Sequence, residues 1–201
     1  MLPTNFQAKK ITTKLSWDDL VLLPDTFVKI HEVEKWINKS DSQKKKLGIQ
    51  RKLKRGYSTL FYGPSGSGKT LTATILGKVT HRDVYKFDLS MMVSKYIGET
   101  EKNLSHLFDR AENKDWILFF DEADALFGKR TEGRDAHDRY VNEEVSYLLQ
   151  RIEEYNGLVI LATNFRENID EAIIRRLNTI IYFPKPNSRA VKDAIEKPFQ
   201  R

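Results

Sequence analysis

A glycine-rich stretch from Gly63 to Thr70 carries the residues of this chain that are best suited to chemistry. It fits the pattern G-x-x-x-x-G-K-[ST] of a phosphate-binding P-loop. Because glycine has no Cβ, such a loop can curl with its N–H groups facing a concavity that attracts polyanionic phosphate. The motif predicts that a nucleotide is bound by Gly63, Pro64, Ser65, Gly66, Ser67, Gly68, Lys69, Thr70 and Leu71.

Two residues of this loop have chemical roles of their own. Lys69 can reach the β- and γ-phosphates, and the Thr70 hydroxyl can ligate Mg²⁺. The loop follows an apolar run, Leu60–Tyr62, and a helical pattern begins at Lys69. This strand, loop and helix context is the one that a P-loop requires, so we expect a Mg²⁺-bound nucleotide here.

Two carboxylates, Asp121 and Glu122, follow the apolar run Trp116–Phe120. Parallel sheets bind ligands at the carboxyl ends of their strands, so these acids should meet the P-loop. Asp121 would hold Mg²⁺ directly or through water, and Glu122 would polarise the attacking water. The alternative is that both acids only favour the start of the next helix.

Two further polar pairs follow predicted elements. Thr163 and Asn164 end the buried run Leu158–Ala162, and Asn164 could hydrogen-bond a water or the γ-phosphate. Arg175 and Arg176 end a short predicted helix and could serve as an arginine finger toward the γ-phosphate of a neighbouring subunit. The alternatives are a turn or cap at Thr163–Asn164 and ordinary helix-terminal cations at the arginines.

Periodicity predicts the elements that must position these residues. Helical spacing covers Asp25 to about Asn38, 69–79, Thr100–Glu112 and Val141–Ile152. Buried or alternating runs at 60–62, Asp83–Leu89, 116–120, 158–162 and Thr179–Phe183 read as strands. Strands that alternate with helices predict an α/β fold with a parallel sheet covered on both faces.

Composition sets broad limits on the chain. With 201 residues and 40% hydrophobic residues we expect one α/β domain around one core. There is no cysteine, so disulfides and Cys-ligated metals are excluded. No signal-peptide pattern or long apolar run is present, so we expect a cytoplasmic protein without a membrane partner. The net charge of +6 is concentrated at Lys44–Arg55, a solvated face or a nucleic-acid contact.

Taken together, the motifs resemble those of AAA+ ATPases of the AAA type, in that family's order. The resemblance implies a three-layer P-loop fold with a five-stranded parallel sheet in the order 5-1-4-3-2, ATP and Mg²⁺ as cofactors, and a homo-oligomer, usually a hexamer. It divides the chain into a flexible lead-in (1–15), the nucleotide-binding large subdomain (16–186) and the start of a truncated helical lid (187–201). It also identifies a pore loop that grips a protein substrate, comprising Lys95, Tyr96, Ile97 and Gly98.

Other segments refine this resemblance. Residues 93–104 and 119–130 are similar to bacterial AAA ATPases encoded with extracellular contractile injection systems, and 128–137 is similar in position to a second pore loop. Two departures stand out. Arg175 and Arg176 are adjacent, whereas the family separates its two arginines. Only one helix's worth of chain follows the last predicted strand, so we expect the lid to be essentially missing.

These patterns predict a Mg²⁺-dependent ATPase that remodels or unfolds a protein substrate. Glu122 would activate water, Asn164 would sense the γ-phosphate, and Arg175 or Arg176 would act in trans. Two other functions stay open. The first is a nucleic-acid-linked loader. Only the basic run supports it, so we expect no nucleic-acid partner. The second is a non-hydrolysing switch or scaffold, which the expected absence of the lid would favour.

Overall fold

The computed structural model describes residues 8–47, 56–90, 100–112, 114–127 and 136–185. Five of the six strands run parallel in a sheet whose full order is β1-β3-β4-β5-β2-β6. Numbered along the chain, the parallel strands have the expected order 5-1-4-3-2. They are β2 (Tyr57–Tyr62), β3 (Val84–Asp88), β4 (Ile117–Asp121), β5 (Leu158–Thr163) and β6 (Thr179–Tyr182).

The sheet has a sixth strand that the sequence did not predict. β1 (Lys9–Ile11) pairs antiparallel with β3, so the expected five-stranded sheet is a mixed sheet of six strands in the described part of the chain. Lys10 Nζ also forms a 2.7 Å ion pair with Asp83 Oδ1. Three residues are too few to show a period of two. The strand depends instead on the open edge of β3, which local sequence does not reveal.

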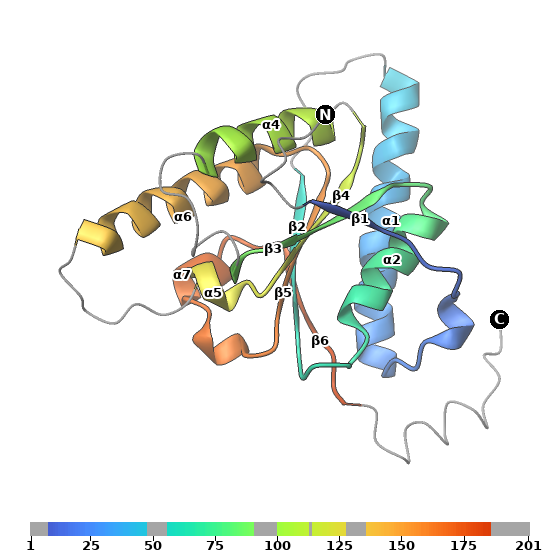
Figure 1. The fold of residues 1–201 in the computed structure, drawn as a ribbon. Coiled ribbons are helices and arrows are strands. Elements are labelled where there is room, and N and C mark those ends of the chain that lie inside the picture. Colours follow the sequence, from blue (N-terminus) through green and yellow to red (C-terminus); the bar gives the residue numbers. More distant parts are fainter. Residues whose placement is uncertain (1–7, 48–55, 91–99, 113, 128–135, 186–201) are drawn as a thin grey trace.

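Helices cover both faces of this sheet (Figure 1). α1 (Pro24–Leu47) and α2 (Lys69–Val79) lie on one side, and α4 (Thr100–Glu112) and α6 (Ala136–Glu154) lie on the other. Short helical turns complete the fold, namely η1 (Trp17–Asp19), α5 (Asp124–Phe127), η2 (Arg166–Asn168) and α7 (Glu171–Ile174). The expected three-layer α/β architecture is therefore confirmed.

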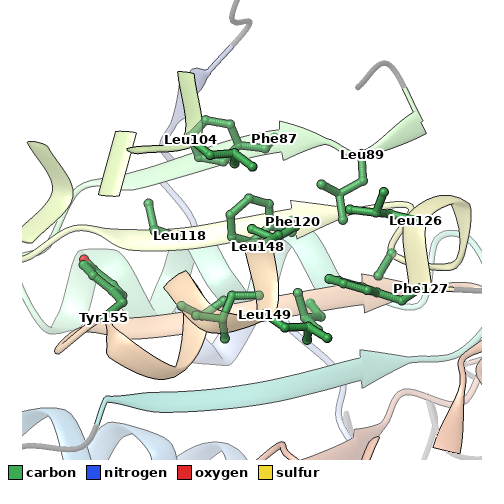
Figure 2. Packing of buried hydrophobic residues seen from close by; sticks show 14 of the residues in the cluster. Phe87, Leu89, Leu104, Leu118, Phe120, Leu126, Phe127, Leu148, Leu149 and Tyr155 are labelled. Atoms are coloured by element: carbon green, nitrogen blue, oxygen red, sulfur yellow. The ribbon is translucent and has the colours of Figure 1, made fainter. Parts of the chain in front are cut away.

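Strand alternation divides the core between the two faces. Phe120 points to the α4/α6 side, where its ring packs against those of Phe87 and Phe108 at centroid distances of 5.2 and 6.2 Å. Figure 2 shows this cluster between the sheet and the helices. The neighbouring Phe119 belongs to the cluster on the α1/α2 side. Residues of the same parity as Phe119 on β4, including Asp121, therefore face the helix that follows the P-loop.

Helix α1 differs from the expected element at both ends. The helix was expected from Asp25, but it begins one residue earlier at Pro24, where a missing N–H costs nothing and the fixed φ suits the helix. The helix also continues past Asn38 to Leu47. Thr26 Oγ1 and Lys29 Nζ donate hydrogen bonds of 2.8 and 3.0 Å to the carbonyls of Tyr182 and Ile180 on β6. These bonds attach α1 to the outer edge of the sheet.

Several expected segments fall outside the described residues. They include the start of the lead-in (1–7), part of the basic run (48–55) and the start of the lid (186–201). Within the residues that the structure describes, no helix combines the length and the apolar character that crossing a bilayer would require.

The packing of α2 on β3 yields a test of the fold. A Cβ on Gly77 would lie 2.3 Å from Val84 Cγ2 and 2.8 Å from the backbone oxygen of Arg82. A helical Gly→Ala change alone stabilises by about 1 kcal/mol, but overpacking against backbone costs about 1–3 kcal/mol. We expect Gly77→Ala to lower the free energy of unfolding in urea. Val79→Ala, at an exposed position of the same helix, is the control. A Gly77→Ala protein of equal or greater stability would contradict this packing.

Candidate functional site

The predicted site residues lie at the carboxyl ends of three adjacent strands. β2 leads into the loop 63–68, while β4 ends at Asp121 and β5 ends at Thr163. Tyr62 is in register with Thr163, and Phe120 with Leu161, so the three strand ends lie side by side. The parallel sheet therefore brings the P-loop, the acidic pair and Asn164 to one edge, as the sequence predicted.

Positive φ angles shape the P-loop. Gly63, Gly66 and Gly68 have φ of 144°, 76° and 97°, in the region that side chains disfavour. A Cβ on Gly63 would lie 2.0 Å from Phe183 O, immediately beyond β6. At Gly66, by contrast, a Cβ would meet nothing within 4 Å. The loop is thus packed tightly at its start and open at its middle.

The open part of the loop presents unused hydrogen-bond donors. Gly63 N–H donates to Thr163 O, and Ser67 N–H donates to Pro64 O. In the part of the chain that the structure describes, the N–H groups of Gly66, Gly68 and Lys69 have no acceptor. Since Lys69 also begins α2, the positive end of the helix dipole adds to these donors. The arrangement fits a polyanion such as the phosphates of a nucleotide.

Lys69 joins the loop to β5. Its side chain is buried, at 8% exposure. Its Nζ donates to the carbonyls of Gly63 and Pro64 and, at 2.9 Å, to Asn164 Oδ1. Burial lowers the pKa of Lys69, while the charges of Asp121 and Glu122 oppose that shift. All three direct partners are neutral oxygens, so a buried cation stands at the loop without a contacting anion among the described residues, as a phosphate-binding lysine requires.

The carboxylate of Asp121 is engaged through both of its oxygens. Oδ1 accepts a 3.1 Å hydrogen bond from Glu122 N–H, and Oδ2 forms a 2.5 Å ion pair with Lys86 Nζ of β3. Asp121 and Lys86 have the parity of Phe119, so both face the α2 side of the sheet. The structure therefore holds Asp121 on the side from which Thr70, in the first turn of α2, could share a metal ion.

Glu122 lies in an acidic and strained environment. Its φ is 53°, which is uncommon for a residue other than glycine. Burial raises the pKa of its carboxyl group, and the nearby charges of Asp121, Asp124 and Asp88 raise it further. A carboxylate with a raised pKa accepts a proton more readily, which suits a general base that activates water.

Thr163 connects this turn to Asn164. The buried Thr163 Oγ1 donates to Asp124 Oδ1 and accepts a 3.0 Å hydrogen bond from Phe165 N–H. The turn that the sequence offered as the alternative for Thr163–Asn164 is thus present, and Thr163 also contacts α5, which follows the acidic pair.

The oxygen donors fit a magnesium ion held together with phosphate. Among the described residues there is no group of three or more His, Cys, Asp or Glu that could hold a metal alone. Mg²⁺ in nucleotide sites takes only one or two protein oxygens and completes its octahedron with phosphate and water. A hydroxyl from Thr70 and a carboxylate oxygen from Asp121 meet that requirement.

The structure does not bring the two arginines to this site. Both are exposed and follow α7, and Arg176 Nη1 lies 3.3 Å from Glu153 Oε1 of α6. No hydrogen bond or ion pair links either arginine to the P-loop or to the acidic pair in the described part of the chain. The predicted pore loop, Lys95–Gly98, and 128–135 of the second pore loop lie outside the described residues.

Sequence reasoning missed three charged neighbours of the acidic pair, namely Lys86, Asp88 and Asp124. β3 carried a partial signal, because Lys86 and Asp88 alternate with Phe87 and so share one face. Their relevance became visible only with the pairing of β3 and β4, which places Asp88 in register with Asp121.

Comparison with known proteins agrees with this geometry. A sequence model of the ATPase family associated with various cellular activities (AAA) matches residues 59–185, more than half of the chain. An uncharacterized AAA family ATPase of Sinorhizobium fredii is 33% identical over 153 residues, covering 75% of this chain and 46% of that protein.

Two further relatives have descriptive names. Proteasome-activating nucleotidase 1 of Haloferax volcanii is 37% identical over 135 residues, covering 64% of this chain and 33% of that protein. The Arabidopsis thaliana protein SUPPRESSOR OF K(+) TRANSPORT GROWTH DEFECT 1 is 36% identical over 135 residues, covering 65% and 31%. The chain thus spans 31% to 46% of the length of these three relatives.

The pKa of Glu122 gives a pH-dependent prediction. Because folding raises this pKa from its ordinary value of 4.5, the group's favourable contribution to stability is complete below pH 4.5 and is lost as the pH rises through the raised pKa. We expect Glu122→Gln to stabilise the nucleotide-free protein against urea at pH 7 to 8, with a smaller effect near pH 4. Glu167→Gln, at an exposed carboxyl, is the control. A loss of stability in Glu122→Gln at pH 7 would contradict the assignment.

Proposed function

Because the chain belongs to the AAA family of ATPases, we propose that it binds Mg²⁺–ATP at the edge formed by β2, β4 and β5 and hydrolyses it. One observation carries this proposal. The buried ammonium of Lys69 bridges the P-loop carbonyls and Asn164 and contacts only neutral oxygens. An incoming γ-phosphate would supply the missing negative charge and replace partners that bind the cation more weakly.

The roles of the other residues follow from their positions. The N–H groups of the P-loop and of the first turn of α2 would hold the phosphate oxygens. Thr70 and Asp121 would hold Mg²⁺, which when bound neutralises charge on the β- and γ-oxygens. Glu122 would orient the attacking water and take its proton, and its raised pKa suits that task. Asn164, already in contact with Lys69, would report whether the γ-phosphate is present.

We extend this activity to work on a protein substrate. One relative is named a proteasome-activating nucleotidase, and the segment 95–98 with its aromatic Tyr96 would contact the substrate in a central pore. A hexameric ring would let Arg175 or Arg176 reach the γ-phosphate of a neighbour, since among the described residues neither arginine contacts the P-loop or the acidic pair of its own chain. The link to contractile injection systems rests on the resemblance of residues 93–104 and 119–130.

The proposed hydrolysis has a direct test. Glu122→Gln should bind a fluorescent ATP analogue but lose turnover by about 100-fold or more, the usual worth of a general base. Lys69→Ala should not bind the analogue, because the ammonium that would contact the phosphate and that holds the loop carbonyls is removed. Glu167→Gln and Lys114→Ala, at exposed positions, are the matched controls. ATP binding without turnover in the wild-type protein would favour a switch or scaffold. Affinity for nucleic acid that collapses with salt would favour the loader.

Mixing two inactive variants tests the trans role of the arginines. The Arg175→Ala/Arg176→Ala double variant keeps its own P-loop, and Lys69→Ala keeps both arginines. If the arginines act across subunits, the mixture should recover turnover that neither variant shows alone, and the wild-type rate per subunit should rise with protein concentration. The absence of recovery, together with a concentration-independent wild-type rate, would place catalysis within one chain. Separate Arg175→Ala and Arg176→Ala variants identify the acting residue.

A further inference from the structure

The ion pair between Lys86 and Asp121 has a consequence for how the site takes up its metal ion. Asp121 Oδ2 lies 2.5 Å from Lys86 Nζ, and Oδ1 accepts from Glu122 N–H. The Lys86 ammonium therefore stands where a cation would bind the carboxylate. Its side chain is 32% exposed and that of Asp121 is 20% exposed, so the pair is partly shielded from water.

The sheet explains why this lysine reaches the acid. Lys86 is in register with Phe119 on the adjacent parallel strand, which makes Asp121 its diagonal neighbour on the same face. Lys69, the other cation near Asp121, is bound elsewhere, to the P-loop carbonyls and Asn164. Lys86 is thus the cation that directly neutralises the metal-binding carboxylate when no nucleotide is present.

We propose that Lys86 is a positioning residue that competes with Mg²⁺ for Asp121 and moves to Asp88 when the metal binds. This inference rests on the proposed function. Asp88 lies two residues along β3, on the face of Lys86, and is in register with Asp121. Its Oδ1 accepts from Ser90 N–H at 3.0 Å and from the Ser90 hydroxyl. These bonds hold the Asp88 carboxylate in place as a second partner for Lys86.

This exchange keeps the charge of the site balanced in both states. Without metal, the ammonium on Asp121 offsets part of the negative charge that Asp88, Asp121, Glu122 and Asp124 bring to this end of the sheet. With Mg²⁺ on Asp121, the ammonium would be repelled by the metal and attracted by Asp88. The site then discriminates against Mg²⁺ that arrives without phosphate, because phosphate adds the ligands that outweigh the ion pair.

The test measures the affinity of the protein for a non-hydrolysable ATP analogue, once with Mg²⁺ present and once with EDTA. The quantity compared between variants is the ratio of the affinity in Mg²⁺ to the affinity in EDTA. Lys86→Met should raise the ratio of the two affinities by about three- to fivefold, the usual worth of a partly exposed ion pair, whereas Lys86→Arg should stay near wild type. Asp88→Asn should lower the ratio. In the double variant Lys86→Met/Asp88→Asn the effect of Asp88→Asn should vanish, since it acts through Lys86. Lys10→Met, which breaks the 2.7 Å ion pair between β1 and Asp83, the residue just before β3, is the matched control.

The outcomes separate this inference from the proposed function. Wild-type protein that binds no analogue under either condition would overturn both. Normal binding with an unchanged or lowered ratio in Lys86→Met would overturn the inference alone. An Asp88→Asn effect that persists in the double variant would also overturn it, because the charge of Asp88 would then act on the metal directly. If Lys86→Met fails to fold in a urea titration, Lys86→Gln replaces it in the same comparison.

Discussion

The buried ammonium of Lys69 is the interaction on which the rest of the site depends. A charge at 8% exposure is costly unless it is well coordinated. The carbonyls of Gly63 and Pro64 supply part of that coordination only because the loop curls through positive φ angles. Asn164 supplies the remainder from the end of β5. Loop shape, strand order and the position of Asn164 are therefore linked through one cation.

The acidic side of the site is organised differently, through like charges held close together. The turn after β4 places Glu122 at a φ of 53°, and Ala123 N–H donates to Ala162 O of β5. The Asp124 carboxylate accepts from Thr163, which immediately precedes Asn164. A change in the contacts of Asn164 would thus be transmitted to the turn that carries Glu122 through Thr163 and its hydrogen bond to Asp124. The short path connects phosphate recognition with the proposed general base without requiring a long-range rearrangement.

The sequence was sufficient for the elements whose cause is local. The P-loop, the helix from Lys69 and the buried strands follow from glycine spacing and from apolar runs, and the order of the parallel strands follows from the family resemblance. β1 was missed because its three residues gain their structure from the edge of β3. The helix α1 begins at Pro24, one residue before the expected start, because proline is tolerated in the first turn of a helix. Lys86 and Asp124 were missed because their partners are distant in sequence and depend on strand register.

The two edges of the sheet have a bearing on how copies of the chain can meet. Side chains from α1 donate hydrogen bonds to the outward-facing carbonyls of Ile180 and Tyr182 on β6. At the opposite edge, β1 is only three residues long and carries the exposed Lys9 and Lys10. Capped carbonyls, short strands and lysines are the features by which proteins prevent strands of different molecules from pairing. Subunits of the proposed ring would therefore associate through side chains on helices and loops, and the sheets would remain separate even at the high local concentration that a ring creates.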